Sequence, residues 1–227
     1  MSFPPPAAPD CAVIELRQYT LHPGRRDELI ALFDREFVEP QEAAGIRVLG
    51  QFRDLDDADR FVWLRGYADM AARGDALPVF YGGPVWAAHR NAANATMVDS
   101  DDVLLLRPAW PGSALPAPAQ PRAGRDTTAL PPGVLGITVL HLKAPADAAL
   151  LEVCRSAVTQ RLGCYVTEAA ANNFPRLPVR EGEPVLVLMG WLSGSEAAAI
   201  EPLLQPWLAR PPQSLRLAPT ARSALHA

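Results

Sequence analysis

FVWLRGY (residues 61–67) and VLVLMGW (residues 185–191) are two copies of one seven-residue pattern, and this pattern decides the fold. Both copies consist mainly of aromatic, β-branched and aliphatic residues, which favour β-strands. The glycines at 66 and 190 align, and so do the aromatic residues that follow them, Tyr67 and Trp191. Such self-similarity within one chain indicates an internal duplication.

The duplication extends outward from these two strands. Pro23 and Pro145 each follow a predicted strand, in a position that suits the first turn of a helix. Gly45 and Gly163 each open the second strand of their half. The first half then reads as strands at 13–21, 46–53, 61–67 and 103–107, with helices at 25–43, 68–77 and 84–95. The second half reads as strands at 135–143, 164–170, 184–192 and 215–217, with helices at 145–161 and 195–208.

This order predicts an α+β fold made by tandem duplication of ferredoxin-like βαββαβ units. Each unit has a four-stranded antiparallel sheet with its helices on one face, which leaves the other face bare. The two antiparallel sheets are therefore expected to cover each other and pack into one α/β barrel.

A proline-rich segment divides the chain into two domains. We expect a disordered leader at 1–11, a first ferredoxin-like domain at 12–108, a linker at 109–132 and a second, degenerate domain at 133–227. The prolines at the linker are Pro108, Pro111, Pro116, Pro118, Pro121, Pro131 and Pro132.

Composition excludes several classes of protein. The chain has 227 residues, a formal net charge of −4 and 49% hydrophobic residues. It lacks the run of about 18 apolar residues that a membrane span needs, and a mildly acidic chain is a poor nucleic-acid binder. Its cysteines, Cys11, Cys154 and Cys164, are too few for a disulfide framework and are typical of free thiols in a reducing cytoplasm. We therefore expect a cytoplasmic protein with no membrane span and no nucleic-acid partner.

Strand alternation predicts which side chains face the barrel interior. With Ile14 and Leu16 assigned to the helix side of the first strand, Glu15, Arg17 and Tyr19 point inward. The same reasoning places Phe61, Trp63, Arg65 and Tyr67 inward on the third strand. The matched inward positions of the second half are Ile137, Val139, His141, Val185, Val187, Met189 and Trp191.

The predicted interior contains a candidate anion site. Glu15, Arg17 and Arg65 supply two cations and one anion, a balance that suits a carboxylate or enolate ligand. The alternative is a structural ion network that satisfies itself. Aromatic side chains form a candidate ligand wall, although aromatic residues also fill ordinary cores. The expected ligand-binding residues are Glu15, Arg17, Trp63, Arg65, Tyr67 and Trp191, and the expected proton-transfer residues are Tyr19 and His141.

The first half also resembles a known family. The segments ELRQYTLHPG (15–24), FVWLRGYADMAAR (61–73) and PVWAAHRNAAN (84–94) are similar to the NIPSNAP family of dimeric α/β-barrel proteins, over about residues 12–108. The resemblance implies a ferredoxin-like α+β barrel, usually made by two chains and here by two halves of one chain. Related barrel families include cofactor-free monooxygenases and haem-degrading enzymes, so chemistry inferred from this relation is fold-level analogy.

The leading hypothesis is a protein that binds a small anionic or aromatic molecule in the barrel interior. Such a protein could be a cofactor-independent enzyme of the monooxygenase or isomerase type. The alternative is a non-enzymatic protein-interaction module with a filled barrel. No phosphate-binding loop, dinucleotide fingerprint or metal-ligand spacing occurs, so neither a cofactor nor a metal is expected. A homodimer through the 84–95 helix is left open.

Overall fold

The computed structural model describes residues 11–118, 121–157, 162–192 and 201–227, so the expected leader lies almost wholly outside the described residues. The first half consists of β1 (Val13–Leu21), α1 (Arg26–Leu32), the π-helix η1 (Phe33–Phe37), α2 (Val38–Ala43), β2 (Arg47–Asp54), β3 (Arg60–Tyr67), α3 (Met70–Tyr81), α4 (Pro84–Asn94) and β4 (Met97–Pro108). The second half consists of β5 (Leu135–His141), α5 (Ala148–Ala157), β6 (Gly163–Thr167), β7 (Val185–Trp191), α6 (Glu201–Leu204), the 3-10 helix η3 (Gln205–Trp207) and β8 (Gln213–Pro219).

The eight strands form a closed barrel in the order β1-β3-β2-β8-β5-β7-β6-β4, with every neighbouring pair antiparallel. The first half supplies β4-β1-β3-β2 and the second supplies β8-β5-β7-β6, so the two halves have the same strand order. This confirms the predicted fold class, a tandem pair of ferredoxin-like units packed into one α/β barrel. Both units come from a single chain.

Two short seams join the halves. At one seam β2 pairs with β8 from Phe52↔Pro219 to Asp54↔Leu217. At the other, β4 pairs with β6 from Leu106↔Thr167 to Pro108↔Tyr165. Closure removes the free strand edges that each open sheet would expose.

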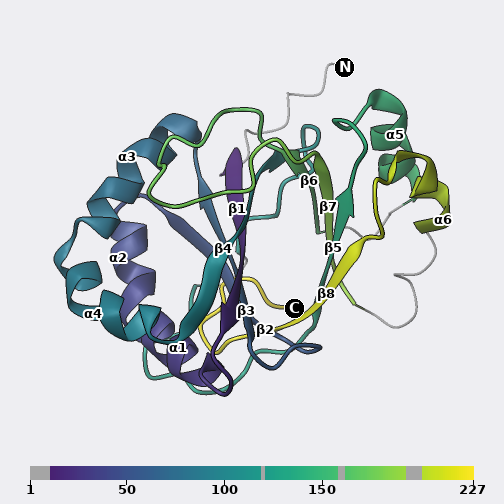
Figure 1. Cartoon of the computed structure of the whole chain (residues 1–227). Helices are drawn as coiled ribbons and strands as arrows, with labels where there is room; N and C mark the ends of the chain where they lie inside the picture. Colours follow the sequence, from purple (N-terminus) through teal and green to yellow (C-terminus); the bar gives the residue numbers. More distant parts are fainter. Residues whose placement is uncertain (1–10, 119–120, 158–161, 193–200) are drawn as a thin grey trace, which may run out of the picture.

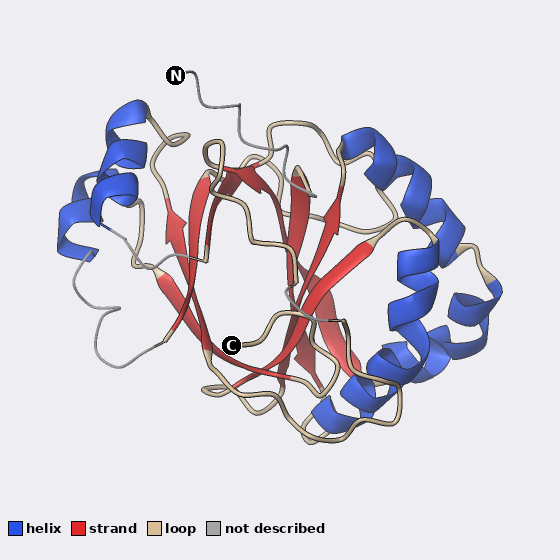
Figure 2. Ribbon diagram, turned by 180° about the vertical axis from the view of Figure 1, so that it is seen from behind, coloured by secondary structure: helices blue, strands red, loops and turns tan. Residues whose placement is uncertain are grey.

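The helices cover the outside of the barrel on two opposite sides. Helices α1 to α4 form a layer over the strands of the first half, and α5 and α6 lie over the second half (Figures 1 and 2). The helix predicted at 25–43 forms as α1, η1 and α2 in succession, so Pro40 lies within α2. Pro78 likewise lies inside α3, so the helix predicted to break before it runs on to Tyr81. No described helix combines the length and the apolar character that a membrane span requires.

The barrel interior is mainly apolar, with the amide side chains of Gln18 and Gln213 hydrogen-bonded across it. Side chains from both halves form one buried cluster there. Its members include Ile14, Leu16, Val62, Leu64, Ile137, Val139, Val187, Met189, Leu215 and Leu217. An eight-stranded barrel is narrow enough for such side chains to fill it. Two further buried clusters lie between the outer face of the barrel and the helices, one under each helix layer.

The face assignment made for the first half was therefore wrong. Ile14 and Leu16 point into the barrel, and the alternate residues Glu15, Arg17 and Tyr19 point toward the helices. On β3 the same inversion applies to Phe61, Trp63, Arg65 and Tyr67. The assignment failed because both faces of β1 and β3 are buried, so alternation alone does not say which face is the inner one.

The inversion also corrects the residue-by-residue match between the halves. The cross-strand pair Glu15↔Arg65 faces the helices, whereas the matched pair Ile137↔Met189 faces the barrel interior. A shift of one residue moves a side chain to the opposite face of a sheet. FVWLRGY and VLVLMGW thus mark equivalent strands, but their aligned side chains lie on opposite faces.

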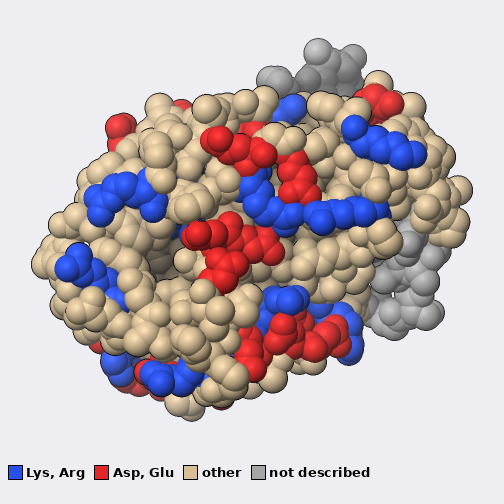
Figure 3. Space-filling view, viewed as in Figure 1, with Lys and Arg blue, Asp and Glu red and all other residues tan. Residues whose placement is uncertain are grey.

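The surface carries charges of both signs. Figure 3 shows acidic and basic side chains gathered side by side over the face that presents β1 and β4, with a hollow between these strands and the helix layer. One such pair joins Arg180 Nη1 to Asp102 Oδ1 of β4 at 2.9 Å.

Candidate functional site

The layer between the first-half strands and helices α2 and α3 contains a buried ionic cluster. Glu15 Oε2 lies 2.6 Å from Arg17 Nη1 and 2.8 Å from Arg65 Nε, and Glu15 Oε1 lies 2.7 Å from Arg73 Nε. All four side chains have at most 2% of their surface exposed. We call these four residues the arginine cluster. Its formal charge is positive, because three guanidiniums share one carboxylate.

Strand register and one helix bring these groups together. Glu15 and Arg65 are direct cross-strand partners on β1 and β3, and Arg17 follows Glu15 on the same face. Arg73 comes from α3, whose first turn is capped by the Asp69 carboxylate accepting from Ala72 N at 2.8 Å. On that helix Arg73 is in line with the buried residues Ala76, Leu77 and Phe80, so its side chain reaches the strands.

The three guanidiniums control the ionisation of Glu15. Burial alone would raise the pKa of Glu15, but Arg65, Arg17 and Arg73 outweigh it and hold that pKa well below its usual value. Burial alone would lower the pKa of Arg65, but Glu15 and the tyrosines around it together outweigh burial and raise that pKa well above its usual value. Glu15 and Arg65 are therefore both charged at neutral pH.

Aromatic side chains surround the cluster. The Trp63 ring centroid lies 5.6 Å from the Arg17 guanidinium and 5.1 Å from that of Arg65, within cation–π range. Arg65 Nη1 donates to the Tyr81 hydroxyl at 3.2 Å, and Arg17 Nε donates to the Tyr19 hydroxyl at 3.0 Å. These rings exclude water from the guanidiniums, which strengthens any electrostatic contact made there.

Two of the tyrosines stay protonated and can donate hydrogen bonds. Burial raises the pKa of Tyr67 well above its usual value, and burial also raises the pKa of Tyr19. The Tyr67 hydroxyl donates to Glu15 Oε1 at 3.4 Å. Both hydroxyl groups keep their protons at neutral pH, so each can stabilise a negative oxygen beside it.

Buried donor atoms in this layer are left without acceptors. Within the part of the chain that the structure describes, Trp63 Nε1 and Arg73 Nη2 have no hydrogen-bond partner. Arg65 Nη2 lies 2.8 Å from Glu15 Oε2 as an ion pair but also makes no hydrogen bond among the described residues. Buried donors in folded proteins are normally satisfied, so Trp63 Nε1 and Arg73 Nη2 are available to a further acceptor.

A loop of the second half closes over the cluster. This loop, residues 168–184 between β6 and β7, crosses from the second half to α3 (Figure 1). Arg73 Nη1 donates to Asn172 Oδ1 at 3.0 Å and to Asn173 Oδ1 at 2.6 Å. The Phe174 ring stacks on Tyr81 with centroids 6.0 Å apart. Residues from both halves therefore build the site.

The structure places two sequence-predicted site residues elsewhere. His141, at the end of β5, contacts Glu183 and Arg210, with its Nδ1 2.8 Å from Glu183 Oε1. Burial and then Arg210 lower the pKa of His141, although Glu183 opposes them. Trp191, at the other end of the β5·β7 pair, is half-buried against the barrel-interior cluster. Glu15, Arg17, Tyr19, Trp63, Arg65 and Tyr67 are brought together, but under the helices and not inside the barrel.

Sequence reasoning missed several residues of the site. These are Gln41, Arg73, Tyr81, Asn172, Asn173 and Phe174. Arg73 had a readable signal, because it lies three and four residues before Ala76 and Leu77 in the helix predicted at 68–77, a spacing that puts the three on one face. The three loop residues had none, because their contact with α3 joins positions about 100 residues apart.

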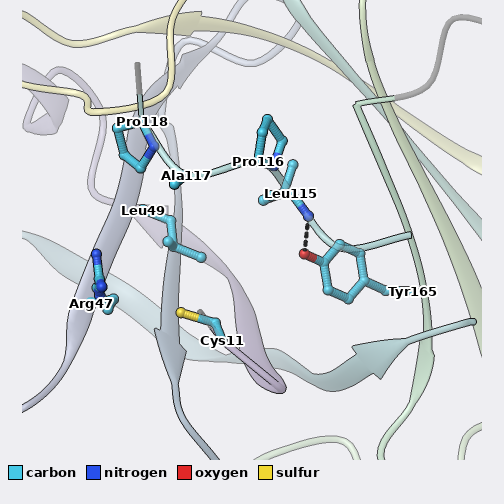
Figure 4. Close-up of a pocket in the computed structure, with 8 residues that line it drawn as sticks. All are labelled: Cys11, Arg47, Leu49, Leu115, Pro116, Ala117, Pro118 and Tyr165. Carbon is cyan, nitrogen blue, oxygen red and sulfur yellow. Dashed lines mark hydrogen bonds between the residues drawn. The ribbon is translucent and has the colours of Figure 1, made fainter. Parts of the chain in front are cut away.

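A small pocket opens at a different place. It is lined by Cys11, Arg47, Leu49, Tyr165 and the 115–118 segment of the predicted linker (Figure 4). The Tyr165 hydroxyl accepts from Leu115 N at 2.7 Å at its edge. Its enclosed space is about that of one water molecule, too small for an organic ligand. Over the described residues, no group of three or more His, Cys, Asp or Glu is arranged to hold a metal ion.

Solved structures resemble the chain in two ways. A presumed monooxygenase from Fusobacterium nucleatum covers 93% of this chain and 94% of its own, with 10% identity and a TM-score of 0.55. A presumed monooxygenase from Lactobacillus acidophilus covers 93% and 96%, with 10% identity and a TM-score of 0.51. At this identity the likeness shows the fold alone, and it extends over both halves.

The first half also has matches of its own. A NIPSNAP-like domain protein from Burkholderia xenovorans has 26% identity over 46% of this chain and 90% of its own, with a TM-score of 0.42. A comparison with curated proteins gives no match. The NIPSNAP family model matches residues 14–110, which span β1 to β4 and hold all four members of the arginine cluster. Over these residues the first half of the chain is similar to the NIPSNAP family.

Proposed function

We propose that the chain binds a small organic anion, a carboxylate or an enolate, in the layer between β1, β3 and helices α2 and α3. The observation that carries the proposal is the charge balance of the arginine cluster, three fully buried guanidiniums around the single carboxylate of Glu15. Burying a charge without a partner is costly, and a bound anion would supply the missing partner.

The shape of the donors supports a carboxylate or enolate over a halide. A guanidinium presents a planar fork that matches two oxygens of one carboxylate. The unpartnered donors of Arg73 and Trp63 belong to the same layer as the hydroxyl groups of Tyr67 and Tyr81. Such donors also stabilise an enolate, whose negative charge develops in oxygenase and isomerase reactions that use no cofactor. The likeness to presumed monooxygenases is compatible with this chemistry and rests on fold.

The proposed site differs from the sequence-based hypothesis in its location. The interior of the barrel is packed with apolar side chains from both halves, as the alternative of a filled barrel supposed. That filling supports a structural role for the barrel. The buried charged groups of the first half lie instead in the helix-covered layer. A solid barrel and a ligand site outside it are therefore compatible.

Calorimetric titration tests the proposal. Benzoate is the probe, and benzamide, which has the same ring without the charge, is the ligand control. We expect benzoate to bind the wild-type chain and Arg73→Gln to weaken that binding at least about tenfold, because a charged hydrogen-bond donor is lost. Benzamide should not bind.

Arg222→Gln is the matched control variant. Arg222 is also a buried arginine, but it pairs with Glu39 and the Asp34 backbone away from the cluster. Benzoate affinity should be unchanged in this variant. Equal benzoate affinity in the Arg73 and Arg222 variants, or no carboxylate binding by the wild type, would overturn the proposal.

A further inference from the structure

Three consecutive residues of the 168–184 loop contact the site with two kinds of chemistry. Asn172 and Asn173 place their side-chain oxygens 3.0 Å and 2.6 Å from Arg73 Nη1. The next residue, Phe174, places its ring on Tyr81 at an interplanar angle of 24°, a stacked arrangement. We call residues 172–174 the loop tip.

The loop tip has the chemical layout of a flat aromatic acid. Two acceptor oxygens converge on one nitrogen, Nη1 of Arg73, and leave Nη2 of the same guanidinium without a partner among the described residues. A carboxylate could engage both nitrogens as a fork. A ring follows directly and stacks on a tyrosine, as an aryl group would. The asparagine oxygens are neutral, however, so they leave the positive charge of the cluster uncompensated.

The rest of the loop is anchored independently of its tip. Glu168 N donates to Leu105 O and Arg180 N donates to Val103 O, both at 2.8 Å, so each end of the loop is bound to β4. Arg180 also pairs with Asp102 of that strand. Within the tip, Asn173 is exposed and Asn172 is half-buried. Release of the tip would also break the bond from Asn173 Nδ2 to Met70 O and expose the buried Phe174 ring, while both ends of the loop keep their bonds to β4.

We propose that the loop tip is an autoinhibitory stand-in for the ligand, and that the ligand class is a small aryl carboxylate. Its carboxylate displaces Asn172 and Asn173 from Arg73, and its ring replaces Phe174 on Tyr81. The inference rests on the proposed function and adds to it the aryl group and the competition with the second half. Only molecules whose tip has left Arg73 can bind the ligand. The apparent affinity for the ligand is therefore the intrinsic affinity multiplied by the fraction of such molecules.

Two tip variants separate the two parts of this competition. Asn172→Ala/Asn173→Ala removes the acceptor oxygens, so benzoate and acetate should both bind about tenfold more tightly than to the wild type. Phe174→Ala removes only the ring, so benzoate should bind more tightly while acetate affinity stays unchanged. Pro175→Ala, an exposed change just outside the tip, is the control and should alter neither affinity.

Amide hydrogen exchange gives a readout that does not depend on variants. Saturating benzoate should speed exchange at residues 172–178 of the wild-type chain, because the ligand expels the tip. Weaker benzoate binding by the tip variants, or slower exchange on adding benzoate, would overturn the stand-in and show that the tip clamps the ligand.

The two proposals fail in distinguishable ways. Benzoate binding that requires Arg73 but is unchanged or weakened in the tip variants retains the anion site and rejects the stand-in. Benzoate binding that acetate matches in every variant rejects the aryl part. Absence of binding by the wild type and by both tip variants rejects the anion site, and the stand-in with it.

Discussion

The two helix-covered layers of this barrel have the same strand order beneath them and opposite chemistry. Under α5 and α6 the buried side chains are apolar, including Leu140, Leu150 and Leu186. Under α1 to α4 the arginine cluster lies among aromatic rings. Both layers close a sheet, so closure does not require charge. An apolar layer is thus sufficient for the structural task in the second half, so the ionic layer of the first half is free to serve the ligand binding proposed above.

The largest expected effect comes from removing the one carboxylate. Glu15→Gln keeps the side-chain volume but leaves three buried guanidiniums without an anion, which should cost about 3–5 kcal/mol of unfolding free energy. Leu140→Met, a volume-conserving change in the other layer, should cost less than about 1.5 kcal/mol. Urea denaturation measures both values, and equal costs would erase the contrast between the layers.

Measuring stability against pH tests whether the negative charge of Glu15 is the cause of this stabilisation. The pKa of Glu15 is held below its unfolded value of 4.5, so its stabilising contribution is complete above that pH and is lost as the pH falls further. Wild-type stability should therefore decline below about pH 4.5 more steeply than that of Glu15→Gln. Parallel declines would show that other carboxylates dominate.

A second variant makes the first layer resemble the other one. Glu15→Leu, Arg17→Met, Arg65→Met and Arg73→Met together replace the whole cluster with apolar residues. Replacing a complete buried ionic network is often neutral or stabilising, so unfolding free energy should stay within about 2 kcal/mol of wild type or exceed it. Benzoate binding should be lost. A variant that fails to fold would show that the charges specify the fold, so that an apolar layer could not replace them in the first half.

The smallest expected effect belongs to the second half. Because the pKa of His141 is lowered in the folded state, the unfolded chain binds a proton more readily, and stability should decline as the pH falls below the unfolded value of 6.5. The expected change in Tm between pH 7.5 and 5.5 is about 1–3 °C. His141→Gln should remove this change, and a Tm difference of the same size in that variant would assign it to another group.

Much of the fold could be predicted from the sequence. Strand patterns, paired prolines and the repeated Gly-aromatic ending were sufficient for the order of elements in each half and for the duplication, because these features are local. They left open whether the barrel closes within one chain or between two chains. Which faces of β1 and β3 point into the barrel was not predictable, since Ile14 and Glu15 are both buried. Alternation distinguishes the two faces of a strand only when one face is exposed to solvent. The tip residue Asn173 meets Arg73 across the two halves, a contact that no local pattern encodes.

The joining of both halves in one chain has a consequence for how many ligands one barrel can bind. A barrel made by two identical chains must repeat every substitution, so it presents its sites in symmetric pairs. Here covalent linkage of the halves lifts that constraint, and one half could keep its ionic layer while the other contributed a covering loop. We therefore expect a stoichiometry of one ligand per barrel and a simple hyperbolic isotherm.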